Sequence, residues 1–226
     1  MVTDGEALTA LLLEKETLEL GVKETAPDDD VKTRAKADRI FEITGAWLED
    51  YFAGKKMPNP VRSSTEKSGK NDKGNGGAST YTIKVGRKEI LLRPEGCRAA
   101  GDAGLRVTPF RQKVWECLCE IPYGETVSYG DIAKRLAAVG GKTADRGKTA
   151  DRGKTAGGGK KKMSAQAVGG AVGHNPISII IPCHRVTGSG GNLVGYGGGM
   201  PVKVKLLKHE GLDINKYIIP IKGTKI

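Results

Sequence analysis

Several residue types are scarce in this 226-residue chain, and each shortage narrows what the protein can be. It has only four cysteines, no two of which have zinc-finger spacing, and only three histidines. No apolar run reaches the roughly 18 residues that a membrane helix needs. Aromatic residues make up only 5% of the chain beside 33 glycines, so part of it is expected to lie outside any core. We therefore expect a cytoplasmic protein with free thiols, no metal and no membrane contact.

Positive charge is abundant but unevenly distributed. The net charge is +11, yet residues 1–59 carry −5 and residues 107–140 are neutral. Two blocks, residues 60–106 at +5 and residues 141–162 at +6, together equal the charge of the whole chain. Residues 163–226 carry a further +5. Because the two middle blocks are the least protein-like parts of the sequence, net charge alone does not establish nucleic-acid binding, although the basic C-terminal third favours it.

Low-complexity stretches divide the chain. Residues 141–162 contain the hexapeptide GKTADR twice and then three consecutive lysines, with no large apolar side chain. This composition predicts a solvated basic loop, in preference to a specific phosphate site. Residues 60–107 begin as a polar, glycine-rich stretch, and we interpret them as a linker or insertion. Within it, Tyr81, Ile83 and Val85 alternate with polar residues, and an apolar run at 90–92 follows the break at Gly86, which predicts a β-hairpin over residues 81–92.

Residues 1–59 are expected to form a partial N-terminal α/β domain. A short apolar strand is predicted over residues 7–14, and a helix over residues 28–57 that ends near Gly54. The apolar stripe of this helix consists of Ile40, Phe41, Trp47, Leu48, Tyr51 and Phe52. The region holds no cysteine or histidine, so we interpret it as a scaffold.

Residues 108–140 and 163–216 have clear helix signals. Thr108 followed by Pro109 marks a helix start, as do Ser128 with Asp131, and Ser164. The helix after Ser164 consists of small residues and has a slim face. Two short helices in succession resemble a helix-turn-helix, although the stretch that joins them is long.

The stretch "IIIPCHRV" places Cys183 directly before His184. A thiol with a pKa of about 8.5 is mostly protonated at neutral pH, and an imidazole can remove its proton. Such a histidine needs an acceptor on its other nitrogen, and Glu210 in "LLKHEG" is the candidate. For an isolated Cys–His pair, a buried structural cysteine beside a surface histidine is the commoner explanation.

The context of this pair changes that balance. "NPISIIIPCHRV", preceded by "SYGDIA" and "SAQAVGGAVG" and followed by "GYGGGMPVKVKLLKHEG", resembles the methylated-DNA–protein-cysteine methyltransferases, which repair O6-alkylated guanine. The resemblance covers about residues 108–140 and 163–212. It implies an α/β protein with a truncated ribonuclease H-like N-terminal domain and a winged helix-turn-helix-like alkyltransferase domain over residues 108–216, followed by a tail at 217–226. The opening β-hairpin of the family is expected to be missing.

The resemblance also implies roles for particular residues. Cys183 takes the alkyl group in an in-line displacement, His184 deprotonates it through a water, Glu210 holds the histidine, and Asn175 braces the turn before the active-site strand "ISIII". Tyr129 helps to rotate the target nucleotide, and Tyr196 packs on the extruded base. The remaining expected contacts to DNA or to the base are Gln166, Ala167, Gly170, Arg185 and Gly197. Taken singly, each position has an ordinary structural explanation, but their joint spacing around PCHRV favours the family roles.

The family resemblance implies a monomer without cofactors that acts once on double-stranded DNA containing alkylated guanine, with O4-methylthymine as a further substrate. Gln166 stands where the family often has an arginine. Two alternatives stay open: a sensor that binds alkylated DNA without repairing it, which lacks the cysteine in known examples, and a helix-turn-helix regulator without chemistry.

Overall fold

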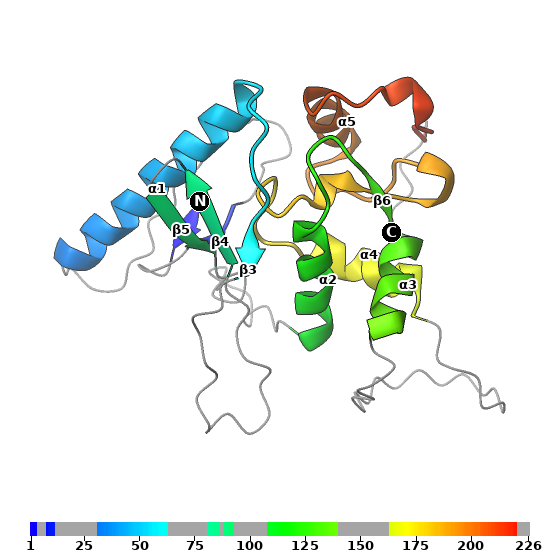
Figure 1. Cartoon of the computed structure of the whole chain (residues 1–226), viewed down its shortest axis with the longest axis horizontal. Helices are drawn as coiled ribbons and strands as arrows, with labels where there is room; N and C mark the ends of the chain where they lie inside the picture. Colours follow the sequence, from blue (N-terminus) through cyan, green and yellow to red (C-terminus); the bar gives the residue numbers. More distant parts are fainter. Residues whose placement is uncertain are drawn as a thin grey trace.

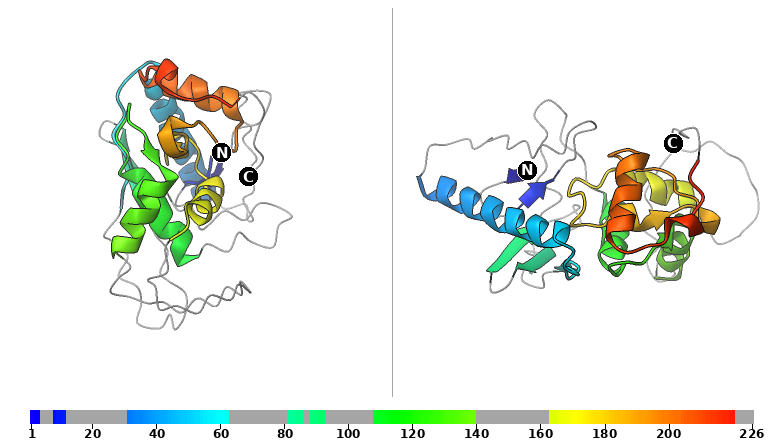
Figure 2. Two further views of the ribbon diagram at one scale, coloured as in Figure 1. Left: turned by 90° about the vertical axis from the view of Figure 1, so that its right-hand side faces the viewer. Right: turned by 90° about the horizontal axis from the view of Figure 1, so that it is seen from above.

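The computed structural model describes residues 1–3, 8–11, 31–62, 81–85, 88–92, 108–139 and 163–220. Within these ranges the chain forms two units that lie side by side, an N-terminal unit of one sheet and one long helix and a C-terminal unit built mainly of helices (Figures 1 and 2). No helix among the described residues combines the length and the apolar character that crossing a bilayer requires. The basic repeat at 141–162 and Cys97 lie outside the described residues.

The N-terminal sheet has five strands in the order β1-β2-β5-β4-β3. Their bounds are β1 Val2–Thr3, β2 Leu8–Ala10, β3 Val61–Arg62, β4 Tyr81–Val85 and β5 Lys88–Leu92. All neighbouring pairs are antiparallel except β2 and β5, which run parallel. The hairpin predicted at residues 81–92 is confirmed as β4 and β5.

The place of this hairpin differs from the expectation. The sequence predicts a linker or insertion over residues 60–107, whereas β3, β4 and β5 from this range supply three of the five strands of the sheet. The physical reason is burial: Tyr81, Ile83 and Leu92 are at most 1% exposed and need an apolar partner, which α1 and β2 provide. Strand β2 matches the predicted strand over residues 7–14 in its described part.

Helix α1 (Val31–Phe52) packs on β4 and β5. It confirms the predicted helix, and Gly54, with φ of 85°, follows its end as expected. The predicted stripe is buried at Ile40, Trp47, Leu48 and Tyr51, but Phe52 is 45% exposed. Tyr51 occupies the inward position of the last turn, so its neighbour Phe52 points away from the core.

The C-terminal unit is assembled from short elements. These are α2 Pro109–Cys119, β6 Val127–Ser128, α3 Tyr129–Val139, α4 Ala165–Gly173, the 3₁₀ helix η3 Cys183–Arg185, β7 Val186–Thr187, the 3₁₀ turn η4 Ser189–Gly191, α5 Met200–His209 and the 3₁₀ helix η5 Ile214–Lys216. The Thr108 and Ser164 side chains accept hydrogen bonds from the first turns of their helices, and Ser128 Oγ accepts from Asp131 N, which confirms all three helix starts. Residues 217–218 are not a free tail, because Leu193 N donates to Ile218 O.

The slim helix α4 packs against α2 and α3. Trp115 of α2 donates its indole N–H to Ala171 O at 3.0 Å, and the Tyr129 ring of α3 lies 3.9 Å from where a Cβ on Gly169 would stand. The small residues of α4 therefore let both helices approach closely, while its Val168, Ala171 and Val172 join the core.

The segment that leads to the cysteine is not the strand that the sequence predicts. Only Ile177 makes a β-bridge, to Leu11, and residues 178–181 turn. Asn175 causes this: its Oδ1 accepts from Ile177 N, and its Nδ2 donates to Ile177 O and Ile181 O. Ile179 takes a φ of 69°, which is rare for a β-branched residue and shows how tightly the turn is held.

Candidate active site

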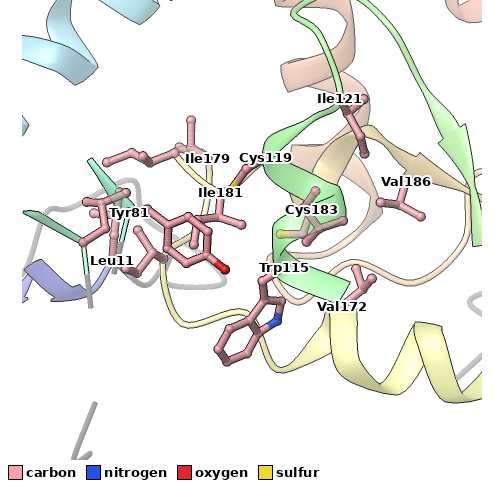
Figure 3. Packing of buried hydrophobic residues seen from close by; sticks show 14 of the residues in the cluster. Leu11, Tyr81, Trp115, Cys119, Ile121, Val172, Ile179, Ile181, Cys183 and Val186 are labelled. Atoms are coloured by element: carbon pink, nitrogen blue, oxygen red, sulfur yellow. The ribbon is translucent and has the colours of Figure 1, made fainter. Parts of the chain in front are cut away.

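Cys183 begins η3 and is 6% exposed. Its side chain lies in the same packed region as Trp115, Ile121 and Val186 (Figure 3). Burial raises the pKa of this thiol, while the Asn175 amide and the positive charge of Lys203 oppose the rise. The thiol is therefore protonated at neutral pH and needs a base to become a nucleophile.

His184, the next residue, is completely buried. Its Nε2 lies 2.8 Å from Glu210 Oε1, and burial lowers its pKa although Glu210 opposes that shift. An ionised carboxylate can only accept, so Nε2 carries the proton and Nδ1 keeps its lone pair. Nδ1 has no hydrogen-bond partner among the described residues. The neutral imidazole of His184 therefore has a basic nitrogen, Nδ1, on the residue that directly follows Cys183.

Glu210, at the end of α5, is 5% exposed and accepts several hydrogen bonds. Its donors are His184 Nε2, Arg185 Nε at 2.9 Å, Arg185 Nη2 at 3.0 Å, Tyr51 OH at 2.9 Å and Gly124 N at 3.2 Å. Burial disfavours the ionised carboxylate, but the bonds from His184 and Arg185 outweigh it and lower the pKa of Glu210 to about 2. The carboxylate is thus ionised throughout the neutral range.

Arg185 does not lie where the resemblance places it. The sequence predicts a DNA contact, but this side chain is 3% exposed. Its Nη1 donates to Asn59 Oδ1 at 2.9 Å and to Ile121 O at 2.7 Å, while Nε and Nη2 bond Glu210. A guanidinium pairs with a carboxylate through two parallel bonds, so the buried Glu210 draws Arg185 inward. It is an interior ion-pair partner.

Two tyrosines line the region around Cys183. Tyr129 OH donates to Val194 O at 3.2 Å and to Gly195 O at 3.1 Å, which ties α3 to the loop before α5. Burial, reinforced by the negative charge of Cys183 in its thiolate form, raises the pKa of Tyr129 to about 12. Tyr196 follows in that loop, and its hydroxyl is buried without a hydrogen-bond partner among the described residues. Gly197 is exposed.

The predicted DNA-contacting residues of α4 share one property. Gln166, Ala167 and Gly170 are all exposed, whereas Val168 and Ala171 of the same helix are buried. A Cβ added at Gly170 would meet nothing within 4 Å. This helix therefore offers a low outer face that another molecule can approach.

Four residues that sequence reasoning missed contribute to the site: Tyr51, Asn59, Gly124 and Lys203. Lys203 is fully buried, donates to Val186 O and to Val194 O, and its pKa is lowered by burial to about 8. Its signal is a lysine in register with the buried Leu206 and Leu207 of α5. Tyr51 gives no such signal, since a tyrosine in an apolar stripe looks like any core residue.

Within the described ranges, no three His, Cys, Asp or Glu side chains cluster as a metal site would require. The groups that the site brings together are a thiol, a neutral imidazole that can act as base, and a buried carboxylate that orients it.

Comparison with known proteins gives this arrangement a context. Residues 109–212 match the family model of the 6-O-methylguanine DNA methyltransferase DNA-binding domain. A methylated-DNA–protein-cysteine methyltransferase of Methanosarcina mazei is 42% identical over 175 residues, which cover 77% of this chain and 79% of that protein. The chain belongs to the methylated-DNA–protein-cysteine methyltransferase family. The range of the family model contains Cys183, His184 and Glu210, but Tyr51 and Asn59 lie outside it.

Other members of the methyltransferase family match over a shorter range. A protein of the same name from Mycobacterium bovis is 47% identical over 106 residues, covering 47% of this chain and 50% of its own length. This chain thus spans about half the length of that relative. The crystal structure of Mycobacterium tuberculosis OGT in complex with DNA is 31% identical and aligns with 79% of this chain and 70% of its own, with a TM-score of 0.44.

Proposed function

We propose that this protein repairs DNA by transferring the alkyl group of O6-alkylguanine to its own Cys183. The observation that carries the proposal is the hydrogen bond between Glu210 and His184, the residue that follows the cysteine. The imidazole of His184 is fixed by Glu210 through Nε2, and its Nδ1 has no partner among the described residues. A thiol followed in the chain by such a base suits nucleophilic transfer to sulfur, with a water to carry the proton between them.

The reaction balances with the groups of this chain. His184 Nδ1, acting through a water, takes the proton of the Cys183 thiol, and Glu210 stabilises the imidazolium that forms. The thiolate attacks the alkyl carbon in line with the C–O6 bond. A C–S bond forms, the C–O6 bond breaks, and the guanine leaves with the electron pair. The imidazolium of His184 then gives its proton to the guanine anion, so the products are a thioether on Cys183, neutral His184 and unmodified guanine.

The DNA partner is proposed to dock on the exposed face of α4. Displacement at a base edge requires the base to leave the stack, so the target nucleotide must rotate out of the helix. The small residues Ala167 and Gly170 suit the narrow minor groove, and Gln166 fills the space that the base leaves. Tyr129 helps the rotation, and Tyr196 and Gly197 contact the extruded base. The guanidinium of Arg185 takes no part in this contact.

Three finer features belong to the same proposal. The substrate range includes O4-methylthymine, which carries its alkyl group on an equivalent oxygen. The protein acts as a monomer. The N-terminal unit is a ribonuclease H-like domain and the C-terminal unit a winged helix-turn-helix, supported by the sheet covered by α1 and by the contact between α3 and α4.

Incubation with duplex DNA that carries O6-methylguanine with a labelled methyl group tests the proposal directly. We expect the label to move to the protein, on the peptide that contains Cys183. Tight and lesion-selective binding without transfer of label would instead identify a sensor of alkylated DNA and refute the proposal.

The transfer is expected to be stoichiometric. A thioether is a poor leaving group, and none of the groups described at the site regenerates the thiol. With excess labelled DNA, incorporation should therefore rise to one methyl group per protein molecule and stop. Continued release of unmodified guanine beyond one equivalent, measured by chromatography of the DNA bases, would contradict this expectation.

Replacement of residues 141–162 by a glycine–serine segment of the same length tests the basic repeat. These residues carry a net charge of +6 and contacts to phosphate carry no lesion information. We expect weaker binding to alkylated and unmodified DNA by the same factor and a shallower salt dependence. The transfer rate constant on the saturated complex should not change. Selective loss of binding to alkylated DNA at fixed salt would show that the segment takes part in recognition.

A further inference from the structure

Helix α1 brings a hydroxyl group to the centre of the site from the other unit of the molecule. Tyr51 is completely buried, and its hydroxyl donates to Glu210 Oε1 at 2.9 Å. The same oxygen accepts from His184 Nε2 at 2.8 Å. One oxygen of Glu210 thus joins the proposed base to Tyr51, which lies 159 positions from Glu210 in the sequence.

The phenol ring is held from several sides. Trp47 stacks on it with ring centroids 5.5 Å apart, and Tyr123 meets it edge-on at 6.1 Å. The backbone carbonyl of Tyr51 also bonds His209 Nε2, next to Glu210 in the chain. Since neither ring nor backbone is free to shift, the hydroxyl has a fixed position toward which the carboxylate must point.

Tyr51 can act only as a donor in this place. Burial, followed by the charge of Glu210, raises the pKa of its phenol, so the hydroxyl stays protonated. Arg185 holds both carboxylate oxygens, Oε2 through Nε at 2.9 Å and Oε1 through Nη2 at 3.0 Å. Tyr51 adds a donor to Oε1, the oxygen that faces His184. Loss of the phenol would leave the Arg185 fork in place but would remove the donor that α1 gives to Oε1, and so would weaken the restraint that directs this oxygen at the imidazole.

We propose that Tyr51 is a positioning residue for the transfer reaction, which keeps Glu210 Oε1 directed at His184 Nε2 so that Nδ1 remains the basic nitrogen. The inference rests on the proposed function and extends it across the two units. It makes the N-terminal unit a participant in forming the thiolate, where the sequence suggests only a scaffold.

Tyr51→Phe removes the hydroxyl and keeps the ring. We expect the rate constant on the saturated DNA complex to fall about tenfold near pH 7, the size typical of a lost partner of a site residue. DNA affinity should be unchanged, since Tyr51 is buried away from the exposed face of α4. The deficit should close as the pH rises above the pKa of the thiol, because hydroxide then forms the thiolate without help from His184.

Tyr123→Phe is the matched control. Tyr123 packs on Tyr51, but its hydroxyl bonds His209 O at 3.2 Å and not the carboxylate. The same chemical change should leave both the rate and its pH profile as in the wild type. An equal loss in both variants, or a Tyr51→Phe deficit that is constant with pH, would mean that the hydroxyl is merely structural and would overturn the inference.

A double-mutant cycle with His184→Gln tests the route of the effect. If Tyr51 acts through the base, Tyr51→Phe should cost nothing further once His184 is gone. An undiminished tenfold loss in that background would refute the inference.

Alkylation of Cys183 by iodoacetamide, followed by mass spectrometry over the same pH range, gives a readout that needs no DNA. This readout separates the two proposals. If the wild type transfers no label from DNA, the proposed function is wrong. The inference about Tyr51 is tested separately, by whether Tyr51→Phe changes the pH dependence of thiol reactivity. If Tyr51→Phe does not fold, fluorotyrosine at this position keeps the shape and strengthens donation. It should then shift the same profile, and an unchanged profile would overturn the inference.

Discussion

Cys183→Ser is expected to abolish alkyl transfer and to preserve binding to alkylated DNA. A hydroxyl has nearly the shape of a thiol but is a far weaker nucleophile, and a neutral imidazole such as His184 cannot ionise it appreciably. The substitution leaves the turn set by Asn175 and the exposed face of α4 in place. Labelled O6-methylguanine DNA should give no label on the protein, while a gel-shift titration should give an unchanged dissociation constant.

Cys117→Ser is the control for this experiment. Cys117 is also a free, buried cysteine, but it lies on α2, and it should keep full transfer activity. Label on the Cys183→Ser protein at the wild-type rate would show that another group accepts the alkyl group. Loss of label in both variants would point to a general effect of removing buried thiols.

Arg185→Met should destabilise the fold strongly, by about 3–5 kcal/mol in the free energy of unfolding. The substitution removes the cation that pairs with Glu210 and leaves the carboxylate buried with too few donors. It also deprives Asn59 Oδ1 of its Arg185 donor and leaves Ile121 O with the Asn59 amide as its donor. Methionine fills most of the space of the arginine side chain, so the loss of stability comes from the unpaired Glu210 charge more than from a cavity. Urea unfolding followed by circular dichroism measures it.

Arg135→Met is the matched substitution at the surface. Arg135 also pairs with a glutamate, Glu120 at 2.8 Å, but their side chains are 53% and 58% exposed. Exposed pairs contribute at most about 1 kcal/mol, so this variant should unfold close to the wild type. Equal losses at the two sites would mean that burial does not set the value of the Arg185 pair.

The effect of Arg185→Met should depend on pH in a defined direction. In the folded wild type the pKa of Glu210 is about 2, below its ordinary value of about 4.3. Its contribution to stability is therefore complete above about pH 5 and is lost as the pH falls toward 2. Without Arg185 the pKa of Glu210 is depressed less, so acidification lowers the free energy of unfolding of the variant by less than that of the wild type. The stability gap between wild type and variant should thus narrow between about pH 5 and pH 2.

The sequence by itself determined the local elements of this protein. Thr108, Ser128 and Ser164 start their helices because a capping side chain bonds a backbone N–H within three residues, which needs no distant partner. The hairpin of β4 and β5 follows from alternation that is visible in the chain. The sequence also predicted Glu210 as the acceptor for His184. The fold then places His184 Nε2 2.8 Å from Glu210 Oε1.

Tertiary structure decided what those elements do together. Arg185 points inward because Glu210 and Asn59 bind its guanidinium there. These partners lie 25 and 126 residues away in the sequence, so no local pattern encodes the pairing. The expected strand before Cys183 became a turn because the Asn175 amide bonds three backbone groups at once. Tyr51 looked like any apolar-stripe residue until the packing of α1 against the C-terminal unit set its hydroxyl on Glu210. A hydrogen bond across 159 positions exists only once the chain has folded, and so only the fold could reveal it.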